Sequence, residues 1–276
     1  MQCCNQPNNS ILPDYFSKFK EKIEQLKYDI QYTNRFFTRN PIQKDIEFAQ
    51  ELSTTYIDSE TELWRARVLN NHDICKFSIP LSDDASLSNL LNDIFKDSEP
   101  FWGYKNPEDC LAPPPDIAPD NRANPRFISY LYTALDIDTA IAEIRPIPGS
   151  KISLAKIVPS KVFKIYDLTN HGLFSPNQDS FNEFYRCLSN AFSTPVHGDL
   201  SDYLVTQYIA EFIKSLDFDG VKYYSAQRGF EQGKIVGKGS NITLFYQDNL
   251  QVTETRVFHI NNIEISSSQI LPAPNK

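Results

Sequence analysis

Apolar side chains recur every three or four positions over residues 14–38, and again over residues 41–55. That spacing is typical of a helix with one buried face. Pro41 separates the two runs, because proline cannot continue a preceding helix. The pattern predicts an N-terminal helical extension over residues 1–60, folded as a hairpin, ahead of a second unit over residues 61–276. Two roles are open to this hairpin: packing against the second unit or binding a partner.

After residue 60 the period changes, and short segments either alternate or are wholly apolar, as β-strands are. The strands expected from this pattern cover residues 63–68, 128–133, 151–158, 161–168, 218–224, 241–246 and 255–265. The expected helices cover residues 87–95, 136–144, 180–192 and 202–216. Strands outnumber helices in this part, so the expected fold class is α+β.

Two connecting segments stand out by composition. Residues 98–126 are rich in proline, and a loop of this length inside a compact domain more often has a function than not. Glycines at positions 229, 233, 237 and 239 predict a mobile loop or a hairpin between two strands.

Charge and cysteine content narrow the classes of partner. The net charge of −8 argues against direct nucleic-acid binding, or binding to an anionic membrane, through a general basic surface. No apolar run approaches the ~20 residues of a membrane span, and the N-terminus lacks the pattern of a secretory signal. The five cysteines lack metal-ligand spacing and are odd in number, which favours reduced thiols in a cytoplasmic protein. A local arginine cluster for a small phosphate ligand remains compatible with this composition.

Three side chains are candidates for a site, and each allows a structural interpretation as well. Arg65 and Arg67 fall on one face of their strand. An arginine there either pairs with a carboxylate or binds a phosphate through its planar guanidinium. Glu143 lies beside the apolar stripe of its helix and is either a semi-exposed helix residue or a site carboxylate. Ser225 either simply ends a strand or belongs to the same site.

Common nucleotide and metal motifs are missing from the sequence. It contains neither a GxGxxG nor a GxxxxGK[ST] motif, and no HExxH motif. The four histidines lie in unlike contexts, so the sequence favours neither a zinc site nor a Ser-His-Asp triad, and no metal is expected.

Taken in order, several short motifs resemble the RES-domain family, which is named for its arginine, glutamate and serine. The match spans residues 61–250, and it is the order of the motifs that makes it specific. The matching segments are residues 63–66 (Leu-Trp-Arg-Ala), 121–125 (Asn-Arg-Ala-Asn-Pro), 130–134 (Tyr-Leu-Tyr-Thr-Ala), 139–143 (Thr-Ala-Ile-Ala-Glu), 203–207 (Tyr-Leu-Val-Thr-Gln), 218–221 (Phe-Asp-Gly-Val), 224–225 (Tyr-Ser) and 241–245 (Asn-Ile-Thr-Leu-Phe). The chain departs from the family pattern at Asn121 and Phe127, where glycines are usual, and at Ala226, where a second serine is usual.

The resemblance implies an ADP-ribosyltransferase-like split β-sandwich with flanking helices. Members of this family are toxins that consume NAD⁺ by phosphorolysis or hydrolysis of the nicotinamide–ribose bond. The resemblance thus implies NAD⁺ as substrate, phosphate as a possible co-substrate and no prosthetic group. It also implies a protein antitoxin with a helix-turn-helix domain, and it leaves a homo-oligomer possible. Two alternatives stay open: transfer of ADP-ribose to a protein or nucleic acid, and a non-enzymatic nucleotide-binding module.

The resemblance also implies residue roles. Glu143 would hold the ribose hydroxyls and offset charge developing on the sugar. Arg65 would bind the pyrophosphate or an attacking phosphate, with Arg67 as the competing candidate for that role. Ser225 would hydrogen-bond a phosphate or the nicotinamide ribose. The further residues expected to contact the nucleotide are Arg122, Asn124, Tyr132, Gln207 and Asn241.

Overall fold

The computed structural model describes residues 18–36, 39–69, 104, 107–169, 179–194, 203–228, 230–231, 234–235 and 239–263. Within them an eight-stranded sheet has the order β1-β5-β6-β9-β3-β2-β4-β10. Neighbouring strands are antiparallel except for β5 and β6, which are parallel. These strands are β1 (Thr54–Ile57), β2 (Leu63–Val68), β3 (Leu131–Ala134), β4 (Lys151–Pro159), β5 (Phe163–Asp167), β6 (Gly220–Tyr224), β9 (Ser240–Leu244) and β10 (Leu250–His259). A separate two-stranded ribbon pairs β7 (Phe230–Glu231) with β8 (Lys234–Ile235).

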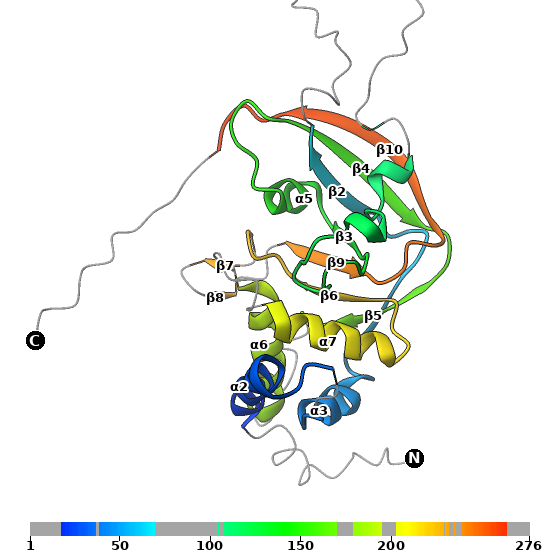
Figure 1. The fold of residues 1–276 in the computed structure, drawn as a ribbon. Helices are drawn as coiled ribbons and strands as arrows, with labels where there is room; N and C mark the ends of the chain where they lie inside the picture. Colours follow the sequence, from blue (N-terminus) through cyan, green and yellow to red (C-terminus); the bar gives the residue numbers. More distant parts are fainter. Residues whose placement is uncertain are drawn as a thin grey trace, which may run out of the picture.

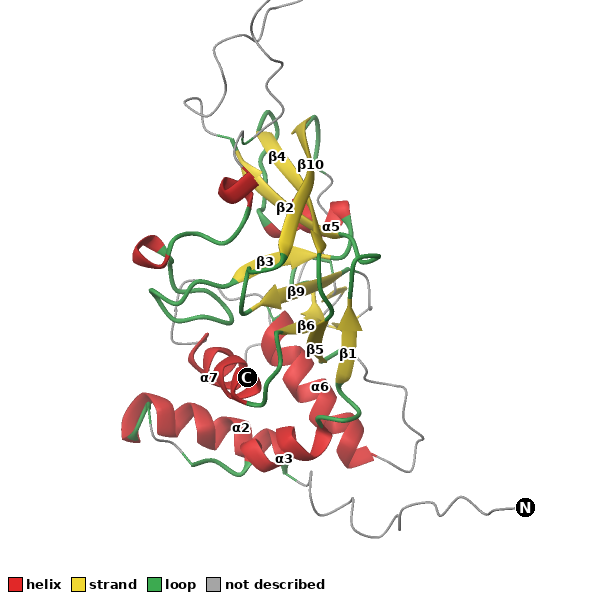
Figure 2. Cartoon of the chain, turned by 90° about the vertical axis from the view of Figure 1, so that its right-hand side faces the viewer, coloured by secondary structure: helices red, strands yellow, loops and turns green. Residues whose placement is uncertain are grey.

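The sheet is divided between β2 and β3. These two strands share one residue pair, Trp64 with Ala134, and no further ladder. On one side of this junction β2, β4 and β10 run steeply across the direction of β3 and β9 (Figure 2). The split leaves room for side chains of β2 to face the same space as side chains of β3.

Helices cover the two parts of the sheet separately (Figure 1). The helices α2, α3, α6 and α7 gather over β5 and β6, while α5 lies alone beside β2 and β3. The α-helices are α2 (Phe19–Tyr28), which continues as a π-helical turn (Asp29–Thr33), α3 (Ile42–Ala49), α5 (Ile137–Glu143), α6 (Asp179–Ser193) and α7 (Leu204–Ser215). Two 3₁₀ turns, η2 (Pro107–Cys110) and η3 (Pro115–Ile117), lie in the proline-rich segment.

The N-terminal helices belong to the largest buried core. Phe19 of α2 and Ile42 and Ile46 of α3 are fully buried and pack with side chains of α6 and α7. Phe19 stacks edge-on against Phe184 at 4.7 Å between ring centroids. Residues before position 60 also supply β1, which pairs with β5. They therefore share both the core and the sheet of the residues that follow.

The predicted α+β class is confirmed, with a divided sheet and flanking helices. The strand over 63–68 and the helix over 136–144 are found as β2 and α5, and the predicted helices over 180–192 and 202–216 are found as α6 and α7. The helix predicted over 87–95 lies outside the described residues.

Some predicted boundaries are wrong. The helix expected to reach residue 55 ends at Ala49, and Thr54 already begins β1, because β-branched and aromatic residues there favour a strand. The described part of the first helix ends as an α-helix at Tyr28 and not near residue 38. The last strand begins at Leu250 and not at residue 255, because its first residues pair with the end of β4.

Candidate functional site

Glu143 owes its position to a short, well-capped helix. Asp136 caps α5, and its carboxylate accepts a hydrogen bond from the Thr139 main-chain N–H at 2.8 Å, as N-cap residues do. Ala140 is buried against the β2 residues Trp64 and Ala66. The α5 helix ends at Glu143, so this carboxylate projects from the last helical residue.

One oxygen of the Glu143 carboxylate is anchored twice. Ser225 Oγ donates to Glu143 Oε1 at 2.6 Å, and Asn241 Nδ2 donates to the same oxygen at 2.7 Å. No described residue donates to Oε2. The carboxylate is thereby held through one oxygen, and the second remains available to a ligand.

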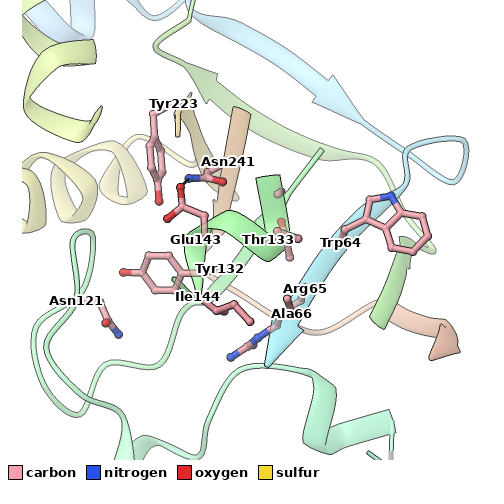
Figure 3. A pocket seen from close by; sticks show the side chains of 12 residues that line it. Trp64, Arg65, Ala66, Asn121, Tyr132, Thr133, Glu143, Ile144, Tyr223 and Asn241 are labelled. Atoms are coloured by element: carbon pink, nitrogen blue, oxygen red, sulfur yellow. Dashed lines mark hydrogen bonds between the residues drawn. The ribbon is translucent and has the colours of Figure 1, made fainter. Parts of the chain in front are cut away.

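The anchored carboxylate faces a cavity of about 290 Å³. Figure 3 shows Glu143 turned toward Asn241 and Tyr223, with Tyr132 and Asn121 across from it. The cavity lies where β2 and β3 separate. Residues of α5, β6 and β9 complete its wall. Its lining residues are Trp64, Arg65, Ala66, Asn121, Tyr132, Thr133, Ala134, Ala140, Glu143, Ile144, Tyr223 and Asn241.

Asn241 lines this cavity and carries a buried acceptor without a partner in the described structure. Its side chain is 6% exposed, and its Oδ1 is buried without a hydrogen-bond partner in the described structure. Because Nδ2 is committed to Glu143, the amide is fixed with this oxygen free. A buried acceptor left unpaired costs free energy, which a ligand donor would recover.

Tyr223 contributes an aromatic ring and a neutral hydroxyl to the cavity. Its hydroxyl lies 3.0 Å from Thr243 Oγ1. Burial, and then the negative charge of Glu143, raises the pKa of Tyr223 to about 12. The phenol therefore stays protonated at neutral pH. The sequence analysis missed this residue, although alternation along β6 places it on the same side as Ser225.

Tyr132, Asn124 and Gln207 form a buried polar group that shapes the cavity wall. Tyr132 Oη donates to Asn124 Oδ1 at 2.6 Å, and Asn124 Nδ2 reaches the carbonyls of Pro119 and Ile128 at 2.9 and 2.7 Å. Gln207 Nε2 donates to the carbonyl of Asn124 at 3.0 Å. Of the three, only Tyr132 lines the cavity, so the other two hold the loop around residues 119–128 in place.

Arg65 and Arg67 form a cationic pair on one face of β2, as predicted. Arg65 Nη1 donates to the Leu111 carbonyl at 2.6 Å, and Arg67 Nη1 donates to the Asp109 carbonyl at 2.6 Å. Burial, followed by the charge of Arg67, lowers the pKa of Arg65 to about 9. None of the ion pairs within the described chain involves either guanidinium. Of the two, Arg65 lines the cavity, which favours it over Arg67 as the ligand-facing arginine.

Arg122 is not among the residues that line the cavity. Its guanidinium donates to the Ala191 carbonyl at 3.3 Å and sits 5.3 Å from the centre of the Tyr203 ring. Its positive charge lowers the pKa of both cavity tyrosines, although burial outweighs this effect and raises them. In this structure the charge of Arg122 affects the pKa of the cavity tyrosines, and Arg122 does not line the cavity.

Ser225 is placed differently from what its expected role requires. It is fully buried. Its hydroxyl donates to Glu143 and accepts the main-chain N–H groups of Gln227 and Arg228, both at 3.1 Å. This hydroxyl holds the Glu143 carboxylate, and it does not line the cavity.

Metal and membrane features were sought over the same ranges. The described residues contain no group of three His, Cys, Asp or Glu side chains suited to a metal ion. Among the described helices, none combines the length and apolarity needed to cross a bilayer.

Comparison with known proteins gives one family match. Residues 93–260 match the family model of the RES domain, a range that includes Glu143, Ser225 and Asn241 but not Arg65. No curated protein matches the chain. Among solved structures, a chain of the M. tuberculosis MbcT–MbcA toxin–antitoxin complex is similar at 14% identity and a TM-score of 0.33, over 55% of this chain and 78% of that chain.

Proposed function

Because this chain belongs to the RES-domain family, we propose that it is a toxin-type enzyme that consumes NAD⁺ by cleaving the nicotinamide–ribose bond. The observation that carries the proposal is the state of the Glu143 carboxylate. One of its oxygens is fixed by Ser225 and Asn241, and the other faces a cavity beside the unpaired Asn241 Oδ1.

These two acceptors suit the hydroxyls of a ribose. Glu143 Oε2 and Asn241 Oδ1 are both hydrogen-bond acceptors, and neighbouring sugar hydroxyls are donors. Breaking the bond between ribose C1 and the pyridinium nitrogen leaves positive charge on the sugar. A fixed carboxylate in a largely buried site stabilises such charge without having to reorganise.

The reaction balances without a general acid. The electrons of the broken bond neutralise the pyridinium, so nicotinamide leaves as a neutral molecule. An oxygen of phosphate or of water forms the new bond to the ribose carbon. When water attacks, its proton is released to solvent. This chemistry requires no histidine in the cavity.

Arg65 is proposed to hold an anionic group of the reactants. A partly buried cation with another cation beside it, and with no carboxylate partner among the described residues, is costly, and a phosphate oxygen would offset that cost. One of its N–H donors is used by the Leu111 carbonyl, which fixes the plane of the guanidinium. The anion is either the pyrophosphate of NAD⁺ or the attacking inorganic phosphate.

The cavity tyrosines Tyr132 and Tyr223 are proposed to pack against the rings of the substrate. The Tyr132 hydroxyl is committed to Asn124 and to the Ala123 N–H, so its ring is the part that a ligand would meet.

We also propose that a helix-turn-helix antitoxin restrains the activity in a cytoplasmic setting, as the family resemblance implies. Arg67, Arg122, Asn124 and Gln207 are proposed to support nucleotide binding from around the cavity.

The test is to incubate the purified protein with NAD⁺, with and without phosphate, and to identify the products by mass. ADP-ribose 1″-phosphate formed only with phosphate indicates phosphorolysis, whereas ADP-ribose indicates hydrolysis. Glu143→Gln is expected to lower the rate by at least about a hundredfold, whereas Glu60→Gln, at an exposed position, leaves it unchanged.

Two other outcomes would replace the proposal. Label from NAD⁺ attached to a protein or nucleic acid would assign ADP-ribosyl transfer instead. Binding of NAD⁺ without consumption would assign a nucleotide-binding module.

A further inference from the structure

We propose that Arg228 is a positioning residue for Glu143. It ties the start of α5 to the chain segment that holds the carboxylate at the other end of the same helix. The inference rests on the proposed function, since it assigns Arg228 a role in that reaction. Arg228 belongs to none of the motifs that carry the family resemblance.

Arg228 makes two kinds of contact, and together they close a ring of interactions. Its main-chain N–H donates to Ser225 Oγ at 3.1 Å, and Ser225 in turn donates to Glu143 at 2.6 Å. Its guanidinium reaches the opposite end of α5, where Nη1 lies 2.8 Å from Asp136 Oδ1 and 3.2 Å from Thr139 Oγ1. Its Nη2 also lies 3.7 Å from Asp138 Oδ2. Both ends of the helix are therefore fixed to one four-residue stretch, 225–228.

The location of this cation is unusual for a helix. The N-terminus of a helix carries partial positive charge and disfavours an arginine there, although the carboxylates of Asp136 and Asp138 offset that charge. Asp136 already caps the helix through its contact with the Thr139 N–H, so capping does not need the arginine. A link between the two segments accounts for the guanidinium better than helix stabilisation does.

Gly239, which directly precedes β9, also lies against Thr139 and Arg228. Gly239 has a φ of +75°, and a Cβ there would collide with Thr139 Oγ1 and lie 3.3 Å from Arg228 Cβ. The Gly239 carbonyl also accepts the Ser225 N–H at 3.0 Å. Both ends of the connection between β6 and β9 thus pack against the first turn of α5.

Because α5 is short, the link made by Arg228 is expected to affect the orientation of this helix. With seven residues, α5 is too short to be stable alone, and its direction depends on what holds its ends. Arg228 and Asp136 are partly exposed, at 35% and 44% of their side chains. Exposed ion pairs contribute little to overall stability, so losing this one is expected to affect catalysis more than unfolding.

The experiment measures steady-state NAD⁺ consumption and thermal unfolding for Arg228→Gln, Arg228→Lys and Asp136→Asn. Asparagine keeps the N-cap but removes the charge. Arg228→Gln is expected to lower kcat at least about tenfold, because a misplaced catalytic group is costly, with KM within about twofold. Arg228→Lys is expected to recover part of the loss. Asp136→Asn is expected to reproduce part of it, since the 3.7 Å ion pair with Asp138 remains, and the double variant to be no worse than Arg228→Gln alone.

Arg256→Gln is the matched control, since Arg256 is exposed and forms its ion pair with Glu254 within β10. It is expected to leave kcat unchanged. Hydrogen exchange of residues 137–143 supplies a readout that needs no activity. It is expected to accelerate in Arg228→Gln and in Asp136→Asn, but not in Arg256→Gln.

The outcomes separate the two proposals. A wild-type protein that does not consume NAD⁺ refutes the proposed function, while the exchange measurement still tests the link. A folded Arg228→Gln protein with unchanged kcat overturns the positioning role. So does a loss of kcat that follows the loss of thermal stability in every variant.

Discussion

The Ser225 hydroxyl donates a 2.6 Å hydrogen bond to Glu143 Oε1 across 82 positions of sequence. Ser225 follows β6, and Glu143 ends α5, which packs on β2. The bond therefore joins the two parts of the sheet that separate between β2 and β3, and it does so at the cavity.

Ser225→Ala is expected to impair both catalysis and stability. The substitution frees Glu143 Oε1 from one of its two donors and leaves the N–H groups of Gln227 and Arg228 without their acceptor. The expected cost is about 1–3 kcal/mol in the free energy of unfolding and at least about tenfold in kcat. Denaturant titration and product assays check these values. Ser215→Ala, on the exposed surface of α7, is the control, and an equally active Ser225→Ala protein would contradict the assignment.

Asn241→Leu is expected to separate binding from stability. Leucine has a similar size but lacks the buried, unpaired Oδ1, so the protein recovers the cost of that orphan acceptor. It also loses the 2.7 Å hydrogen bond to Glu143. We expect a melting temperature within a few degrees of wild type and a kcat/KM for NAD⁺ lowered at least about tenfold. A variant that melts unchanged and turns over NAD⁺ normally would show that Oδ1 does not contact the substrate.

Phosphate is expected to stabilise the protein through Arg65. The folded-state pKa of Arg65, about 9, lies below the ordinary 12.5. The charged guanidinium therefore costs folding free energy at every pH below about 9, and that cost fades as pH rises from about 9 toward 12.5. At pH 7 an anion that binds this cation recovers the cost, so phosphate should raise the melting temperature of wild type. Arg65→Gln should lose most of this rise, whereas Arg256→Gln, an exposed arginine on β10, should keep it.

Local signals made part of this site predictable. The cap at Asp136 and the apolar face around Ala140 are encoded within a few residues, and the helix that carries Glu143 follows from them. Alternation along β2 likewise placed Arg65 and Arg67 on one face. In contrast, β1 was missed because Thr54–Ile57 is short and directly follows a helical pattern.

Contacts between segments that are distant in the sequence could not be predicted from such local signals. The bond from Ser225 to Glu143 depends on how β6 pairs with β9 and how β9 pairs with β3, which no local pattern specifies. The same holds for Asn124, whose side-chain amide donates hydrogen bonds to carbonyl groups of its own loop. Family motifs indicate which residues gather at the site, but only the hydrogen bonds show that Ser225 holds Glu143 and does not face the cavity.

Lys22→Met is expected to destabilise the protein in a pH-dependent way. Lys22 Nζ lies 2.8 Å from Asp45 Oδ2 and joins α2 to α3. Burial raises the pKa of Asp45, while Lys22 opposes that rise. A carboxyl whose folded-state pKa is raised stabilises the fold most below its unfolded pKa, and that contribution is lost as pH rises through the folded pKa. Without Lys22 the ionised carboxylate is unpaired, so the loss of stability at pH 7 should reach about 3 kcal/mol.

The same variant should lose less at pH 4 than at pH 7, because the raised pKa of Asp45 makes its carboxyl easier to protonate in the folded protein than in the unfolded chain. Chemical denaturation at the two pH values measures the difference, with Lys18→Met, at the exposed start of α2, as the control. Since α2 and α3 pack with α6 and α7 in one core, unfolding should remain a single transition in each variant. An equal loss at both pH values would contradict the expected titration of Asp45. A separate early transition would show that the N-terminal helices unfold independently of the residues that carry the site.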